Sequence, residues 1–152
     1  MFSKKPFLIA GPCSAESQEQ MLEIAAAFKN NDKVDMIRAG VWKPRSKPGN
    51  FEGMGEAALQ WFQEVKQVSG KKVCTEVATP EQIELALKYD IDAFWIGARS
   101  TVNPFTVQEI ADALKGTNKP VLIKNPINPD VDLWAGAIER IQGAGIKEIA
   151  CI

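Results

Sequence analysis

Short apolar runs alternate along the chain with stretches in which apolar residues recur every three or four positions. The apolar runs are brief and nearly continuous, with Ile and Val prominent, which is typical of parallel strands buried on both faces. The spaced stretches are typical of amphipathic helices. We predict six strands, over Phe7–Ala10, Met36–Ala39, Val73–Val77, Ala93–Ile96, Val121–Lys124 and Glu148–Ile152.

Helix-start signals support the helical segments between these strands. Ser17 and Gln20 have the spacing of a capping box, and Thr79-Pro80-Glu81-Gln82 offers a cap, a first-turn proline and a capping-box glutamine. Asn103-Pro104 opens a further helix in the same way. We predict five helices, over Gln18–Lys29, over Glu56–Val68, from Thr79-Pro80, from Asn103-Pro104 and over Leu133–Ile141.

The alternation of strand and helix predicts a parallel sheet with right-handed crossovers, in one domain over residues 1–152. Two architectures fit, an open doubly wound sheet and a (β/α)8 barrel. No GxGxxG motif follows the first strand, which weakens the dinucleotide-binding form of the doubly wound sheet. Eight units of this size would give about the 250 residues typical of a barrel. We therefore expect an incomplete (β/α)8 TIM barrel with about six parallel strands and five helices.

Composition and charge narrow the class of protein. The chain has 152 residues, 45% of them hydrophobic, and a formal net charge of −1, which argues against a nucleic-acid or polyanion binder. No apolar run approaches the roughly 20 residues that span a membrane, and the N-terminal segment does not read as a signal peptide. The cysteines lack paired spacing, which indicates free thiols in a reducing cytoplasm. The chain has no histidine to act as general base or metal ligand.

The unusual polar residues share one position, since each ends or follows a predicted strand. In parallel α/β folds the carboxyl ends of the strands converge on the face that carries the active site. Residues far apart in sequence would therefore meet there, and together they supply cations, a carboxylate and a thiol. The set comprises Cys13, Ser14, Arg38, Lys43, Arg45, Glu76, Arg99, Lys124 and Asn125.

The segment RAGVWKPRSKPGNFEG, residues 38–53, gathers several cations in a chain that is nearly neutral overall. Arginine offers a planar fork that grips phosphate or carboxylate, and a lysine at a buried strand end is costly without an anionic partner. The prolines at 44 and 48 restrict the backbone, and the glycines at 49 and 53 permit sharp turns. The segment therefore predicts a loop that is held over a bound anion.

Plainer interpretations stand beside this one. The KPR run would be solvated charge, Arg99 would pair with a helix carboxylate, and Lys124 would cap a helix. Cys13 would be a small buried side chain, as we expect for Cys74 and Cys151. The tryptophans, at scattered spacings, indicate packing. The recurrence of polar residues at the ends of successive strands favours the anion site.

Five stretches, GPCSAES, RAGVWKPRSKPGNFEG, TEVATPEQ, IGARSTVNP and LIKNP, resemble the successive strand-end motifs of 3-deoxy-D-arabino-heptulosonate 7-phosphate (DAHP) synthases. The resemblance covers essentially the whole chain, in order, and is strongest to the compact type related to 3-deoxy-manno-octulosonate 8-phosphate synthase. It implies a (β/α)8 barrel and a transferase that begins the shikimate pathway of aromatic amino acid biosynthesis. Such an enzyme condenses phosphoenolpyruvate (PEP) with erythrose 4-phosphate and releases phosphate.

The resemblance also implies a role for each matching residue. Cys13 would be a metal ligand, and Glu76 would order a water near PEP. The remaining residues would bind the aldose phosphate and the carboxylate and phosphate of PEP, namely Arg38, Lys43, Arg45, Ser46, Arg99 and Lys124. Catalytic roles would fall to Lys43, Lys124 and Glu76.

The implied metal site is incomplete in this sequence. Cys13 would bind a divalent metal, which would be Mn, Fe, Co or Zn, and a thiol rather than an asparagine at this position indicates a metal-dependent member. The family takes its other ligands, a histidine, a glutamate and an aspartate, from the last strands, which are expected beyond residue 152. We therefore expect the front part of a longer cytoplasmic enzyme that is inactive alone. The complete enzyme would be a homo-oligomer, with a regulatory or chorismate mutase domain fused or associated as in some members.

Three alternatives remain open. An octulosonate 8-phosphate synthase would share the PEP half of the site and use arabinose 5-phosphate, although the KPRS stretch favours the four-carbon aldose. A second alternative is a non-catalytic fragment that binds phosphate ligands. A third is a flavodoxin-like module, an open sheet in which Arg45, Arg99 and Lys124 would point to separate surfaces.

Overall fold

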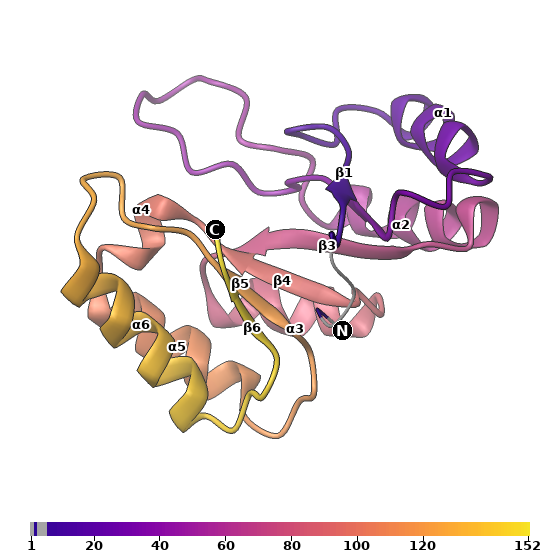
Figure 1. Cartoon of the computed structure of the whole chain (residues 1–152). Coiled ribbons are helices and arrows are strands. Elements are labelled where there is room, and N and C mark those ends of the chain that lie inside the picture. The colour runs from indigo at the N-terminus through magenta and orange to yellow at the C-terminus, as the bar shows by residue number, and fades with distance from the viewer. Residues whose placement is uncertain (1, 3–5) are drawn as a thin grey trace. The chain divides into compact units, whose positions relative to one another are not determined.

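Figure 1 shows the computed structural model of the chain, which describes residue 2 and residues 6–152. The chain forms two compact units. The N-terminal unit comprises residues 6–76 and 86–92, and the C-terminal unit comprises residues 77–85 and 93–152 together with residue 2. None of the described helices is long and apolar enough to cross a membrane.

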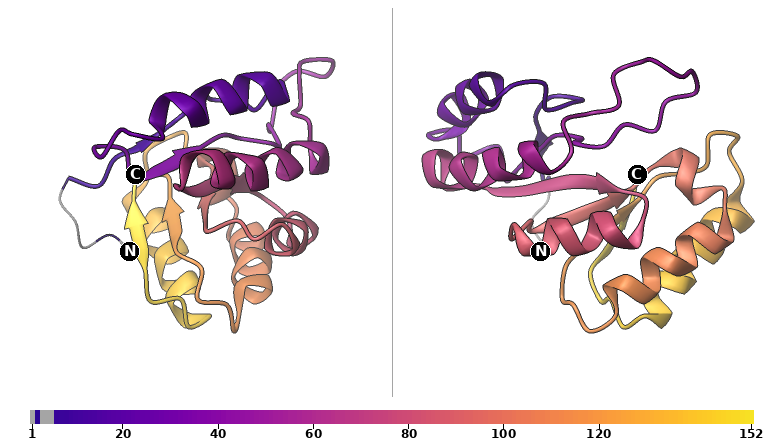
Figure 2. Two further views of the ribbon diagram at one scale, coloured as in Figure 1. Left: turned by 90° about the vertical axis from the view of Figure 1, so that its right-hand side faces the viewer. Right: turned by 180° about the vertical axis from the view of Figure 1, so that it is seen from behind.

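Three parallel strands form the sheet of the N-terminal unit. They are β1 (Ile9–Ala10), β2 (Met36–Arg38) and β3 (Lys72–Val77). β2 lies between the other two. Helices α1 (Gln18–Phe28) and α2 (Glu56–Ser69) follow β1 and β2 in the chain and pack against each other (Figure 2). Met21 and Ala25 of α1 and Leu59 and Phe62 of α2 are fully buried, so the apolar stripes predicted from sequence form the core of this unit.

The C-terminal unit also carries three parallel strands, which are β4 (Ala93–Ile96), β5 (Val121–Ile123) and β6 (Ile149–Cys151). β5 lies between the other two. The helices are α3 (Pro80–Lys88), which ends in the N-terminal unit, α4 (Ala98–Thr101), α5 (Pro104–Leu114) and α6 (Val131–Gly143). Helices α5 and α6 lie side by side (Figures 1 and 2). All residues of β4 and β5 are buried, as expected for strands covered on both faces.

Within each unit the strands stand in the order in which they occur in the chain. In a flavodoxin-like sheet β1 would separate β2 from β3, whereas here β2 and β3 pair directly. Parallel strands that neighbour one another in chain order, each followed by a helix, are the arrangement of a (β/α) barrel. The chain therefore has the fold of a partial barrel, and the six predicted strands are confirmed.

The structure departs from the sequence-based expectation at several element boundaries. The described residues form six helices rather than five, because α4 is a single turn, too short to show a helical period. The first strand is shorter than predicted, since the Leu8 N–H donates to the Asp35 carboxylate at 2.9 Å rather than to a strand. Lys124 lies just after β5 rather than within it. Cys151, expected in the core, is exposed, because β6 pairs on one side only among the described residues.

The predicted caps are present, with one difference in geometry. In α1 the Gln20 N–H donates to Ser17 Oγ at 3.1 Å, as in a capping box. The Gln20 Oε1, however, accepts from the N–H of Glu16 at 3.0 Å rather than from that of Ser17. At α3 the Gln82 Oε1 likewise accepts from the N–H of Ala78 at 2.8 Å, one residue before the cap. Each glutamine therefore fixes, through a hydrogen bond, the backbone of the loop that precedes its helix.

Candidate functional site

Three of the predicted residues meet in the N-terminal unit, at the carboxyl ends of its strands. Lys43 Nζ lies 3.1 Å from the backbone oxygen of Cys13, 3.5 Å from Cys13 Sγ and 3.9 Å from Glu76 Oε2. The side chains of Lys43 and Glu76 are only 9% and 10% exposed. Because either charge alone would carry a large desolvation cost, each stabilises the other in this position. The site thus sets a paired cation beside an exposed thiol.

Gly40 allows these residues to meet. The Gly40 N–H donates to the backbone oxygen of Cys13 at 3.2 Å, and the Ala15 N–H donates to Gly40 O at 3.1 Å, which joins the loop after β1 to the end of β2. A Cβ atom on Gly40 would lie 3.0 Å from that Cys13 oxygen and 3.0 Å from Lys43 Nζ. Contacts this short are rarely tolerated in a close-packed interior. The Lys43 side chain therefore reaches Cys13 by passing over Gly40, which has no side chain to block it.

Arg38 ends β2 and is half-buried beside β3, where it stands in register with Cys74. Burial raises the pKa of the Cys74 thiol to about 12, and the neighbouring charge of Arg38 opposes that rise. Cys74 is therefore a neutral core residue at physiological pH, as predicted. Arg38 lies at the strand end, as its ligand role requires, and that role stays a prediction.

The predicted anion-binding loop is closed at its base. The Lys43 N–H donates to Glu52 O at 2.8 Å, which brings the two ends of the loop together. Gly53 has a φ of +100°, and a Cβ atom there would collide with the Val41 carbonyl oxygen. Glycine is the residue that fits such a turn. The loop therefore has a defined backbone path.

The tip of this loop carries exposed polar side chains. Arg45 and Ser46 are both exposed. The Arg45 Nε–H donates to Phe51 O at 2.8 Å, across the loop. A guanidinium has five N–H donors, so this bond orients the group and leaves its terminal nitrogens able to bind an anion.

In the C-terminal unit, Lys124 lies against the ring of Trp95. Its Nζ is 5.9 Å from the ring centre, within the range of a cation–π interaction. The Lys124 N–H donates to Ile96 O at 3.1 Å and the Asn125 N–H to Ile152 O at 2.9 Å, which holds the chain between two strands. Among the described residues, Asn125 Oδ1 is buried and lacks a hydrogen-bond partner. A buried acceptor in that state favours a ligand that supplies the donor.

Arg99 is exposed on α4, directly after β4. The N–H groups of Ser100 and Thr101 donate to Gly97 O at 2.9 and 3.0 Å, and the Thr101 hydroxyl donates to the same oxygen at 3.0 Å. Both of those residues are buried, so the turn is fixed from its inner side. Arg99 is thus the charged residue that this turn presents outward.

The structure brings Cys13, Lys43 and Glu76 together and sets Lys124 beside Trp95. The convergence of these two groups on one face stays a prediction. The interpretation of Cys13 as a buried side chain is wrong, because it is exposed. In the part of the chain that the structure describes, no three potential ligands from His, Cys, Asp and Glu lie together, so Cys13 could supply only one ligand of a metal site.

Sequence reasoning missed the roles of Gly40 and Trp95. A glycine directly after a strand end was an available signal for the first, because a close approach of two loops often needs one. For Trp95 the signal was an aromatic residue near the end of β4, the strand that pairs with β5 just before Lys124. Its ring contact, however, depends on strand register, which the sequence pattern does not give.

Comparison with known proteins finds relatives of this chain. The model of the DAHP synthetase I family matches residues 3–152. The phospho-2-dehydro-3-deoxyheptonate aldolase of Thermotoga maritima is 33% identical over 142 residues, which cover 93% of this chain and 40% of that protein. A 2-dehydro-3-deoxyphosphooctonate aldolase of Helicobacter pylori is 36% identical over 90 residues, which cover 55% of this chain and 33% of that protein.

Solved structures give the same result. The crystal structure of the Thermotoga maritima heptonate aldolase (DAHP synthase) superposes with a TM-score of 0.78 at 32% identity, over 95% of this chain and 40% of that one. A truncated form of 3-deoxy-D-arabino-heptulosonate 7-phosphate synthase from the same organism gives a TM-score of 0.74 at 30% identity, over 95% of this chain and 50% of that one. The chain thus spans half or less of the length of these relatives. On its sequence and its fold, the chain belongs to the DAHP synthetase I family.

Proposed function

We propose that the complete protein carrying this chain is a DAHP synthase, which condenses PEP with erythrose 4-phosphate and releases phosphate. The observation that carries the proposal is the buried Lys43–Glu76 pair beside Cys13 at the strand ends of a chain that belongs to this family. The phospho-2-dehydro-3-deoxyheptonate aldolase of Thermotoga maritima, matched over 93% of this chain, supports the same activity.

The charges of the substrates fit the residue types at these strand ends. PEP carries a carboxylate and a phosphate, so Lys124 and Arg99 would bind these groups, and Lys43 and Arg38 would add positive charge beside them. Arg45 and Ser46, on the exposed loop tip, would bind the phosphate of erythrose 4-phosphate. The enol carbon of PEP attacks the aldehyde carbon of the aldose, and a water adds to the carbon that bears the phosphate, which then leaves.

Glu76 and Lys43 would act together in the step in which water adds to PEP. The Glu76 carboxylate would hold the attacking water, and the ammonium group of Lys43, 3.9 Å away, would hold that carboxylate in position. The cations would also stabilise negative charge that grows on the substrate oxygens as the bonds change. Lys124, oriented by the Trp95 ring, would stabilise such charge in the same way.

Cys13 would contribute a thiolate ligand to a divalent metal such as Mn, Fe, Co or Zn. A sulfur ligand suits a transition metal, and Cys13 Sγ is exposed, 3.5 Å from the ammonium group of Lys43. When bound, the metal would polarise the aldehyde of the aldose as a Lewis acid. The remaining ligands would come from outside this chain.

An octulosonate 8-phosphate synthase is the second candidate, because a 2-dehydro-3-deoxyphosphooctonate aldolase of Helicobacter pylori matches 55% of this chain. The greater coverage of this chain by the heptonate aldolase, 93%, favours erythrose 4-phosphate. We further propose that the enzyme works in the cytoplasm, in the shikimate pathway, as a homo-oligomer. A regulatory or chorismate mutase domain would be fused to it or associated with it.

The test is PEP consumption by the complete protein with added manganese, using erythrose 4-phosphate or arabinose 5-phosphate in parallel. The proposal expects turnover with the four-carbon aldose and little with the five-carbon one. The reverse preference would establish the second candidate, and no turnover with either would contradict both. The 152-residue chain alone, assayed beside it, should be inactive because most of the metal ligands are missing.

A further inference from the structure

Trp134 lies in the first turn of α6, and its indole ring reaches the end of β5. The indole Nε1–H donates to the backbone oxygen of Ile123 at 3.0 Å. The backbone N–H of Trp134 donates to Asp130 O at 3.1 Å, so this residue belongs to the capped start of the helix. The indole bond therefore joins the first turn of a helix to the last residue of the strand before it.

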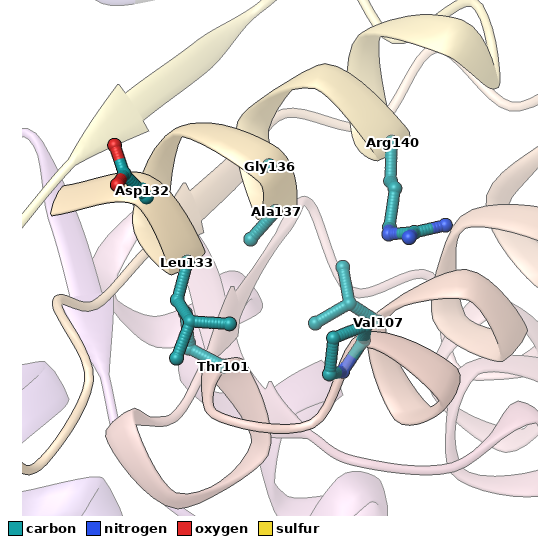
Figure 3. Close-up of a pocket in the computed structure, with 8 residues that line it drawn as sticks. Thr101, Val107, Asp132, Leu133, Gly136, Ala137 and Arg140 are labelled. Atoms are coloured by element: carbon teal, nitrogen blue, oxygen red, sulfur yellow. The ribbon is translucent and has the colours of Figure 1, made fainter. Parts of the chain in front are cut away.

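The sides of α6 explain why this ring points to the strand. Leu133 and Ala137 line a groove of about 190 Å³ together with Val107 of α5, as Figure 3 shows. Successive residues of an α-helix are turned by about 100° around its axis, so Trp134 leaves the helix on a different side from Leu133. Helix α6 thus packs against α5 with one side and contacts β5 with another.

The oxygen that Trp134 binds belongs to the peptide unit that leads into Lys124. Ile123 O also accepts from the N–H of Ile152, just after β6, at 3.0 Å. The N–H of the same peptide unit, which is that of Lys124, donates to Ile96 O at 3.1 Å. A carbonyl oxygen has two lone pairs, and here both are used. The direction in which the Lys124 side chain leaves the backbone is therefore fixed at both ends of the peptide plane.

The bond from Trp134 differs from the other two. The bonds to Ile96 and Ile152 run to neighbouring strands, as in any parallel sheet, whereas the indole bond comes from a helix side chain. Residues 124–130 connect β5 to α6, and Ile127 within this loop is exposed. Loops of this kind are more mobile than the elements that they connect. Because Trp134 links the strand end to the helix across the loop, loop motion disturbs the Lys124 peptide unit less.

We infer that Trp134 is a positioning residue, which acts through Lys124 to orient the ammonium group that binds PEP. The inference rests on the proposed function, in which Lys124 is the partner of a PEP anion. Trp95 orients the ammonium end of the Lys124 side chain, with Nζ 5.9 Å from its ring centre, and Trp134 fixes the backbone end. A side chain that is ordered before the ligand arrives loses less conformational freedom on binding, which raises affinity.

Hydrogen exchange tests the positioning without any substrate. In the complete protein, Trp134→Phe keeps an aromatic ring and removes the N–H, so the Lys124 amide should exchange with deuterium about tenfold faster. The Phe94 amide, which donates to Pro120 O away from this strand end, should not change. Trp61→Phe makes the same substitution on α2 and is the matched control. An unchanged Lys124 amide in Trp134→Phe, or equally faster exchange at Phe94, would overturn the inference.

Steady-state kinetics of the complete protein test the consequence for PEP. Trp134→Phe should raise KM for PEP about five- to tenfold with kcat little changed, because the ammonium group is less well ordered before binding. In a Lys124→Ala background the same substitution should have no further effect, because the ammonium group is absent. An equal change in both backgrounds, or lower thermal stability with an unchanged KM, would overturn the inference. If the unchanged protein did not turn over PEP, the proposed function would fail, and the exchange of the Lys124 amide would still decide whether Trp134 positions that residue.

Discussion

The two units hold their central lysines in different ways. In the N-terminal unit, Lys43 is nearly buried and its charge is balanced by Glu76 within the protein. In the C-terminal unit, Lys124 is half-buried against the Trp95 ring, and no described carboxylate lies within ion-pair distance of it. An aromatic face orients a cation and neutralises little of its charge. The comparison indicates that the charge of Lys124 is available to bind an anion, whereas the charge of Lys43 is balanced by Glu76 within the protein.

Removing the lysine that has no carboxylate partner should have the largest effect on catalysis. In the complete enzyme, we expect Lys124→Ala to lower kcat/KM for PEP by about 100-fold or more, because a substrate anion loses its charged partner. Thermal stability should change little. Lys115→Ala, which removes an exposed lysine after α5, is the control. Normal PEP kinetics in Lys124→Ala would remove the basis for the comparison.

Breaking the Lys43–Glu76 pair should lower the stability of the protein. We expect Glu76→Gln to lower the free energy of unfolding by about 2 kcal/mol, because it leaves the Lys43 charge nearly buried without its partner. Urea denaturation of the complete protein measures this, with exposed Glu84→Gln as the control. The double variant Lys43→Met/Glu76→Gln should regain part of the loss. A Glu76→Gln protein of unchanged stability would mean that the pair is not buried in solution.

The N-terminal unit also buries the Cys74 thiol, which stays neutral rather than being balanced by an opposite charge. The dependence of stability on pH distinguishes this kind of burial from the burial of the Lys43–Glu76 ion pair. The pKa of Cys74, raised by burial to about 12 from an ordinary value of 9.0, means that the folded protein holds the proton more tightly than the unfolded chain. The stabilisation is complete below pH 9 and is lost between pH 9 and pH 12, at up to about 1.4 kcal/mol per pH unit. Unfolding measured at pH 8 and pH 10 should show this slope, and Cys74→Ala should show a smaller one. Equal slopes in both proteins would place the thiol in contact with solvent.

Changing the ring beside Lys124 should give the smallest effect. We expect Trp95→Leu to raise KM for PEP about fivefold and Trp95→Phe about twofold, with kcat little changed, because a weaker or absent π face orients the ammonium less well. Steady-state kinetics of the complete enzyme separate KM from kcat. A fall in kcat alone, equal for both variants, would show that the ring acts through packing rather than through Lys124.

The sequence predicted the strands and the main helices because buried parallel strands and amphipathic helices have distinct apolar periods. It also predicted which residues end strands, and so the grouping of Cys13, Lys43 and Glu76. It could not predict the single turn α4, which is shorter than a helical period, or the exposure of Cys151, which depends on which strands flank β6. The contacts of Lys124 depend on register, which lies outside a periodic pattern.

The offset capping glutamines couple helix ends to loop motion. Gln20 accepts from the N–H of Glu16, three residues after Cys13, and Gln82 accepts from the N–H of Ala78, two residues after Glu76. Each N–H is held by a glutamine side-chain oxygen, so both amides should exchange with deuterium more slowly than a loop amide without a hydrogen bond. In Gln20→Ala the Glu16 amide should exchange faster while α1 remains folded. The exchange rate of the Glu16 amide would then report the motion of the loop that carries Cys13 separately from the unfolding of α1.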